Sequence, residues 1–181
     1  MLILASASPR RHELLLAAGI EHIVRPSAVP EDRHPGEGAA EFVRRIAEAK
    51  ARGVICSPED IVLGADTEVC LDEEVFGKPS SDEDAARMLG RLSGRDHWVY
   101  TGICILSGAR RIVDLSSTKV SFVELTEDDI QGYTRSGEPR DKAGAYAIQG
   151  LASKFVRSIE GSYQNVVGLP VSLAYFHLKA L

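Results

Sequence analysis

Hydrophobic residues in the first third of the chain form alternating strand-like and helix-like patterns. A short apolar run from Leu2 to Ala5 leads through a proline-containing loop into a helical apolar period over Arg11 to Ala18. Apolar side chains recur at three- and four-residue steps over Ala39 to Arg52, which predicts an amphipathic helix with its polar face toward solvent. The continuous apolar run from Ile61 to Ala65 predicts a buried central strand that stops at Asp66.

The rest of the chain continues this alternation of strands and helices. Helices are predicted over Ser80 to Leu92 and from Thr126 to Arg135, each with acidic residues in its first turn. Strands on either side of the Ser107-Gly108 turn are predicted to pair antiparallel. A Gly-Leu-Pro turn leads into a C-terminal helix that ends near Leu178. The remaining predicted strands cover Glu21 to Val24, Val69 to Leu71, Val75 to Phe76, Trp98 to Leu106 and Arg111 to Phe122.

Length, charge and cysteine usage narrow the class of protein. With 181 residues, 44% of them hydrophobic, the chain can bury a core but is short for two independent domains, so we expect one domain over residues 1–181. A formal net charge of -5 argues against a nucleic-acid-binding protein, although a few local cations suffice for a small anionic ligand. No apolar run approaches the ~20 residues of a membrane span. Three widely spaced cysteines fit no disulfide or zinc pattern, and we expect a cytoplasmic protein.

The loop Ser6-Ala7-Ser8-Pro9-Arg10-Arg11 lies between a predicted strand and a predicted helix. Backbone N–H groups at a helix N-terminus, serine hydroxyls and two guanidiniums are groups that bind anionic oxygen. The loop therefore indicates a phosphate site. The alternative is that the serines only cap the helix and the arginines are solvated. It is not a Walker A loop, because the Gly-Lys-Ser/Thr ending is missing.

Asp66 follows an apolar run, and packing does not explain a carboxylate there. A buried charge has to be paired, coordinated or functional, and ligands of α/β proteins collect at the carboxyl ends of strands. The alternative is that Asp66 caps a following turn. Glu31, Lys50 and Lys78 carry no signal in isolation. Cleavage of a triphosphate nevertheless needs cations for the phosphate oxygens and carboxylates for a divalent metal.

The segment Asp141 to Gly150 is rich in glycine and alanine and contains one amide side chain, that of Gln149. Small residues let the backbone approach a ligand closely. The Gln149 amide offers both a donor and an acceptor, so it is suited to reading the edge of a base. Ordinary tight packing is the alternative explanation for this segment.

Five segments, in this order and spacing, resemble the signature blocks of the Maf family: Leu4 to Arg11, Gly64 to Thr67, Gly77 to Pro79, Asp141 to Tyr146 and Val167 to Pro170. The resemblance implies an α/β fold like that of the inosine triphosphate pyrophosphatases, with an elongated mixed central sheet flanked by helices and a cleft between two lobes. It also implies hydrolysis of a nucleoside triphosphate to the monophosphate and pyrophosphate. A divalent cation, Mg²⁺ or Mn²⁺, and a homodimer are further expectations.

The resemblance also assigns roles by position. Asp66 matches the catalytic base, and together with Glu31 it matches the acids near the metal. Residues that match the lining of the phosphate site are Ser8, Arg11, Lys50 and Lys78. Residues that match positions associated with base choice are Arg10, Thr67 and Gln149.

These matches favour a substrate among pyrimidine nucleotides. Family members that act on 7-methyl-GTP usually lack the equivalents of Arg10 and Gln149, so we predict hydrolysis of dTTP and UTP. Two alternatives stay open. One is the same fold directed at 7-methyl-GTP or at a non-standard purine such as ITP. The other is a non-catalytic nucleotide-binding regulator, because members of the family have been linked to cell-division arrest.

Overall fold

The computed structural model describes residues 1–181, and these divide between two compact units. The first unit consists of Met1–Thr67, Tyr100–Ser116 and Gln164–Leu181. The second unit consists of Glu68–Val99 and Ser117–Tyr163. Each unit is therefore assembled from segments that are distant in the sequence. The single domain expected over residues 1–181 stays a prediction.

The first unit contains a partly parallel group of strands. Its strands follow the order β2-β1-β3-β5-β6, where β1 is Leu2–Leu4, β2 is Ile23–Val24, β3 is Ile61–Leu71, β5 is Asp96–Ser107 and β6 is Arg110–Phe122. Strand β1 pairs in parallel with both neighbours, so that Leu4 lies opposite Val24 and Leu63. The helices of this unit are α1 (Pro9–Ala17), α2 (Ala39–Arg52), α6 (Val171–Lys179) and most of α5 (Tyr163–Val167).

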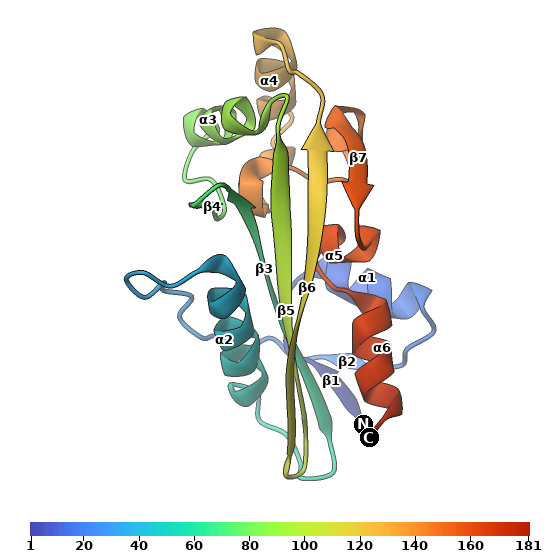
Figure 1. The fold of residues 1–181 in the computed structure, drawn as a ribbon. Coiled ribbons are helices and arrows are strands. Elements are labelled where there is room, and N and C mark those ends of the chain that lie inside the picture. The colour runs from blue at the N-terminus through green and yellow to red at the C-terminus, as the bar shows by residue number, and fades with distance from the viewer. The chain divides into compact units, whose positions relative to one another are not determined.

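Successive residues of the strands in the first unit point to opposite faces, and each face packs into a separate hydrophobic core. Leu4, Leu63 and Ile103 pack on one face with Leu15 of α1 and Ala174 of α6. This is the period-two alternation of a strand that is covered on both faces. Figure 1 shows α2 and α6 on opposite sides of the strands.

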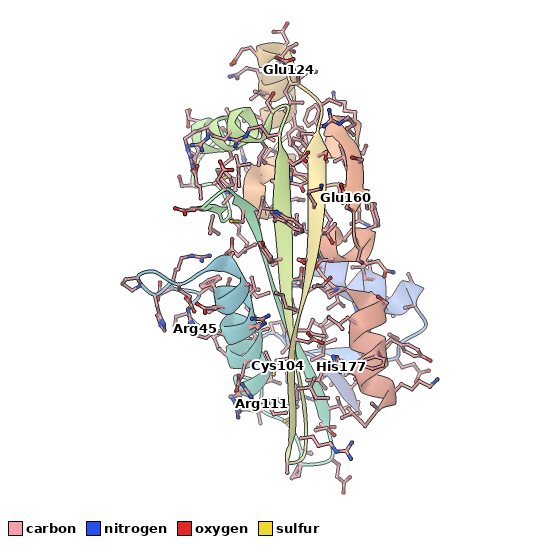
Figure 2. The ribbon with its side chains drawn as sticks, in the orientation of Figure 1. Arg45, Cys104, Arg111, Glu124, Glu160 and His177 are labelled. Carbon is pink, nitrogen blue, oxygen red and sulfur yellow. The ribbon has the colours of Figure 1, made fainter.

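The other face packs against α2. Ile3, Val62 and Cys104 form this core with Ala47 and Ala51 of α2. Figure 2 shows Cys104 on the strands beside α2, with His177 of α6 on the other side. Helices thus flank the strands of this unit on two sides, as expected for an α/β fold.

Two glycines bring α2 unusually close to the strands. A Cβ at Gly64 would lie 2.1 Å from the carbonyl oxygen of Ala47, and a Cβ at Gly102 would lie 2.4 Å from that of Val43. Both separations are far below van der Waals contact, so only glycine fits at these strand positions. The backbone of α2 therefore rests directly on β3 and β5.

The second unit has antiparallel edges. Its strand order is β4-β3-β5-β6-β7, where β4 is Glu74–Phe76 and β7 is Val156–Glu160. Both edge strands pair antiparallel with their neighbours. Helix α3 (Asp82–Leu92) packs against α4 (Glu127–Thr134) and against the short turn Ala143–Ala145. The expected cap of α4 is confirmed as a capping box between Thr126 and Asp129.

The main differences from the predicted elements are in β3 and β7. Strand β3 continues through Asp66 to Leu71, so the predicted stop at Asp66 is wrong. The strand continues because β5 remains beside it and β4 pairs with Val69–Leu71. Strand β7 was not predicted, because it is a partly exposed edge strand in which the exposed residues Arg157 and Ser158 separate its two apolar residues. The predicted α/β class with a mixed sheet and flanking helices is confirmed. None of the helices combines the length and apolar composition that crossing a membrane requires.

Candidate active site

Asp66 lies inside β3, at a point where the strand has lost one neighbour. The parallel pairing of β1 ends with Leu4 opposite Leu63, and the N–H of Ala5 donates to the Leu63 carbonyl at 2.8 Å. After Ala5 the chain of β1 turns away from β3 into the loop before α1. Strand β3 continues without this neighbour, and Asp66 lies three residues after Leu63. The site is thus at the carboxyl end of the parallel strand β1, which is where ligands of α/β sheets bind.

Lys50 links two carboxylates. Its ammonium nitrogen lies 2.7 Å from an oxygen of Asp66 and 2.8 Å from an oxygen of Glu31. Lys50 comes from the last turn of α2, and the close approach of α2 over Gly64 brings it to β3. Glu31 comes from the loop before α2, and its side chain is 47% exposed. Three predicted site residues therefore meet in space.

The electrostatics of Asp66 reflect its burial. Desolvation raises the pKa of Asp66, and the positive charges of Lys50 and Arg11 act in the opposite direction. A carboxyl group that is buried and yet surrounded by cations is typical of a functional site. The two effects together suit a group that has to bind and release a proton.

Arg11 is fixed by hydrogen bonds from all three of its nitrogens. Nε donates to the carbonyl of Gly168 at 2.8 Å, one terminal nitrogen donates to the Ser6 hydroxyl at 3.0 Å, and the other donates to the Thr67 hydroxyl at 3.1 Å. Burial lowers the pKa of Arg11, and the charge of Asp66 opposes that shift. A guanidinium carries five N–H donors, so two remain for a ligand.

The hydroxyls of the loop before α1 do not cap the helix. Ser8 occupies the N-cap position, and its side chain makes no capping hydrogen bond. The Ser6 hydroxyl instead accepts from the N–H of Ser8 at 3.2 Å and from Arg11. The capping explanation is therefore wrong for both serines. The structure favours an arrangement in which Ser6 orients Arg11.

A chain of hydroxyls continues from Arg11 into the core. Thr67 Oγ1 lies 2.9 Å from Thr101 Oγ1, and the Thr101 hydroxyl donates to the carbonyl of Asn165 at 3.1 Å. Because the Thr101 proton is used on that carbonyl, the Thr67 hydroxyl has to be the donor between the two threonines. The Thr67 hydroxyl accepts from Arg11, and it also lies 3.3 Å from the Gly168 carbonyl, which is a second acceptor for its proton. Sequence reasoning missed Thr101, since a threonine in a strand carries no signal of its own.

The other predicted residues lie at the start of α1 or in the second unit. Ser8 and Arg10 are partly exposed at the start of α1, beside Arg11 in the sequence. Lys78 and Gln149 belong to the second unit, and both are exposed. The contacts described for the first unit thus join Arg11 with Thr67, and Lys50 with Asp66 and Glu31. The roles assigned to all of these residues stay predictions.

Comparison with known proteins identifies similar sequences over the whole chain. A family model described as Maf-like protein matches residues 1–181. A dTTP/UTP pyrophosphatase of Koribacter versatilis is 48% identical over 175 residues, which cover 96% of this chain and 91% of that protein. A protein of the same name from Escherichia coli O157:H7 is 52% identical over 179 residues, covering 96% of this chain and 89% of that protein.

Solved structures with a similar fold have much lower sequence identity. The Ham1 protein of Staphylococcus aureus matches with a TM-score of 0.54 at 13% identity, covering 99% of this chain and 98% of that one. A HAM1 protein from Coxiella burnetii matches with a TM-score of 0.51 at 15% identity, covering 98% of each chain. At this identity the likeness concerns the fold alone.

Proposed function

We propose that this chain, which belongs to the Maf family, hydrolyses dTTP and UTP to the nucleoside monophosphate and pyrophosphate. The observation that carries the proposal is the buried pair of Asp66 and Lys50 next to the fixed guanidinium of Arg11. The relatives named for this activity, at about half identity over nearly the whole chain, support the same reaction.

The reaction follows from the chemistry of this group. Asp66 orients a water molecule and accepts its proton while the water oxygen attacks the α phosphorus. The bond from the α phosphorus to the bridging oxygen breaks, and pyrophosphate leaves. The raised pKa of Asp66 brings the carboxylate closer to the proton affinity that a general base needs near neutral pH. Arg11 and Lys50 stabilise negative charge on the phosphates, so positioning and electrostatics supply most of the rate.

A divalent cation, Mg²⁺ or Mn²⁺, is part of the proposal. The structure contains no group of three or more His, Cys, Asp or Glu side chains that would hold a metal alone. Asp66 and Glu31, which share Lys50, offer two carboxylates, and Mg²⁺ is commonly bound by one or two carboxylates together with substrate phosphates. The donor set therefore fits a metal that binds with the nucleotide. When bound, the metal neutralises phosphate charge.

Base choice is assigned to Arg10, Thr67 and Gln149. The amide of Gln149 is exposed in the second unit and presents both a donor and an acceptor. The Thr67 hydroxyl is occupied by Arg11 and Thr101, so its effect on substrate choice would pass through the position of Arg11. Lys78 and Ser8 are assigned to the phosphates.

A panel of nucleotides tests the proposal. Pyrophosphate release is measured with dTTP, UTP, CTP, GTP, ITP and 7-methyl-GTP, each with Mg²⁺ and with Mn²⁺. We expect the highest kcat/KM with dTTP and UTP. A preference for 7-methyl-GTP or ITP would replace the pyrimidine assignment. Binding of UTP without turnover would instead indicate a non-catalytic nucleotide-binding regulator.

Substitution of Asp66 tests the role of the carboxylate. Asp66→Asn should lower the rate at least ~10²-fold, as the loss of a general base does in other enzymes. Asp114→Asn is a matched control, because Asp114 also belongs to the first unit and is paired, with His177 at 2.7 Å. Full pyrophosphate release by the Asp66→Asn protein would refute the assignment.

We also propose a cytoplasmic homodimer. The aromatic side chains of Tyr175 and Phe176 on α6 are 54% and 67% exposed, which supports a contact with another chain. Light scattering after gel filtration measures the mass in solution. A mass of one chain, 19.6 kDa, at micromolar concentration would contradict the dimer.

A further inference from the structure

The exposed amide of Gln149 is carried by a tight turn. The N–H of Gly150 donates to the carbonyl of Ala147 at 3.0 Å, which closes a four-residue turn with Gln149 in its third position. A side chain on an exposed turn would normally sample many positions. The accuracy with which Gln149 is presented therefore depends on what holds the two ends of the turn.

Both ends of the turn are held by one pair of side chains. The N–H of Ala147 donates to the Tyr133 hydroxyl at 3.1 Å, and the N–H of Leu151 donates to a carboxylate oxygen of Glu138 at 3.1 Å. Tyr133 and Glu138 are joined to each other, because the Tyr133 hydroxyl donates to the second carboxylate oxygen of Glu138 at 2.8 Å. All of these residues belong to the second unit.

The polarity of these bonds is unambiguous. A carboxylate is only an acceptor, so Glu138 accepts one hydrogen bond from the Tyr133 hydroxyl and one from the N–H of Leu151. The Tyr133 oxygen is then left to accept from Ala147. Tyr133 is 3% exposed and packs edge-on against Phe155, with ring centroids 5.4 Å apart. Burial and the neighbouring Glu138 raise the pKa of Tyr133, so its hydroxyl keeps the proton that it donates.

The glycine that ends the turn makes room for the carboxylate. A Cβ at Gly150 would lie 2.3 to 2.5 Å from the carboxylate atoms of Glu138. The Glu138 side chain would have to move away, and its bonds to Tyr133 and Leu151 would break. We call the hydrogen bonds of Tyr133 and Glu138 to the two ends of the turn its anchor. Gly150→Ala therefore disrupts this anchor without changing Glu138 itself.

We propose that Tyr133 and Glu138 are positioning residues that hold the turn presenting Gln149 and thereby determine how well the enzyme distinguishes bases. This proposal rests on the proposed function, in which Gln149 reads the base. Neither side chain needs to touch the substrate. Their effect is to limit the positions of the Gln149 amide.

Kinetic selectivity is the first measurement. The ratio of kcat/KM for UTP to that for CTP, and to that for GTP, is compared among wild type, Tyr133→Phe, Glu138→Ala and Gly150→Ala. We expect each substitution to lower these ratios about tenfold, because a displaced hydrogen-bonding group no longer rejects the wrong base. Activity with UTP should fall less than the ratios do.

Tyr146→Phe is the matched control. It removes another buried tyrosine hydroxyl of the second unit, but that hydroxyl contacts His97 at 2.9 Å and no backbone group of the turn. The ratios should stay close to wild type. An equal loss in the control and in Tyr133→Phe would overturn the proposal, and so would unchanged ratios in both Tyr133→Phe and Glu138→Ala.

Amide hydrogen exchange separates this proposal from the proposed function. Glu138→Ala should speed exchange at Leu151, and Tyr133→Phe should speed exchange at Ala147, in the protein without nucleotide. Unchanged exchange at both amides would overturn the anchor even in an active enzyme. If the variants show faster exchange but the wild-type protein releases no pyrophosphate, the proposed function is refuted and the anchor is retained. If Gln149→Ala keeps the wild-type ratios, the link from anchor to selectivity is wrong.

Discussion

Lys50 and Asp66 form a buried ion pair, with the ammonium nitrogen 2.7 Å from a carboxylate oxygen and only 11% and 7% of the two side chains exposed. Removing two charges from water costs several kcal/mol per ion, which their attraction repays only with good geometry. A pair of this kind adds little net stability. Its value lies in keeping a carboxylate ionised and oriented inside the protein.

Loss of one partner should therefore cost more than loss of both. Lys50→Met leaves Asp66 buried without its cation, and we expect about 3 kcal/mol less free energy of unfolding. Adding Asp66→Asn should restore at least about 1 kcal/mol, because the uncompensated charge is gone. Urea unfolding of wild type, both single variants and the double variant measures this coupling as a double-mutant cycle. Simple additivity of the two single effects would contradict the expectation.

The approach of α2 to β3 should be equally sensitive. Gly64→Ala places a Cβ 2.1 Å from the Ala47 carbonyl oxygen, so α2 has to move and carry Lys50 away from Asp66. We expect a loss of about 1–3 kcal/mol in stability together with lower kcat/KM. Gly90→Ala on α3 is the control, since a Cβ there would meet nothing within 4 Å and helix propensity predicts a gain of about 0.5–1 kcal/mol. Chemical denaturation and pyrophosphate release measure both effects.

Thr101 should act on the substrate through Arg11. Thr101→Val keeps the shape of the side chain but removes the hydroxyl that accepts from Thr67, so Arg11 loses part of its support. We expect KM for UTP to rise about tenfold, with a smaller change in kcat. Thr101→Ser, which retains the hydroxyl, should stay near wild type.

Steady-state kinetics with UTP tests this role, and Thr134→Val provides the control. The Thr134 hydroxyl is also buried, but it bonds only the carbonyl of Ile130 in its own helix, at 2.8 Å. If Thr134→Val raises KM as much as Thr101→Val, or if the valine and serine variants at position 101 behave alike, the hydroxyl chain has no special role.

His97 should make the protein sensitive to mild acid. Burial lowers the pKa of His97 to about 4, whereas an unfolded histidine titrates near 6.5. The unfolded chain then binds a proton that the folded protein does not. The contribution of His97 to the free energy of unfolding is fully present above about pH 6.5. Below that, the free energy of unfolding falls by about 1.4 kcal/mol per pH unit as the pH drops to about 4.

Replacement of His97 checks this pH dependence. His97→Gln keeps a polar group near the Tyr146 hydroxyl and cannot titrate, so the difference in unfolding free energy between pH 7 and pH 5 should shrink. His34→Gln, at an exposed position in the loop before α2, serves as the control. An undiminished difference in the His97→Gln protein would show that another group causes the acid sensitivity.

Local patterns in the sequence predicted most elements and several site residues. The helix Ala39–Arg52 was predicted with the bounds that it has in the structure, because its apolar period and the flanking glycines are local signals. Asp66 was identified because a carboxylate after an apolar run is unusual. The expectation that the strand ends there was wrong, since β3 continues past Asp66 and only its parallel neighbour β1 ends at this level.

Only the tertiary structure decided which of these residues meet. Nothing local in the sequence brings Lys50 to Asp66, because that contact depends on the close packing of α2 against Gly64 of β3. The Gly168 carbonyl that holds Arg11 is likewise 157 residues away in the chain. Sequence patterns report the periodicity and chemistry of neighbouring residues. Contacts between distant residues depend on packing, where the absence of one Cβ decides how closely a helix approaches a strand.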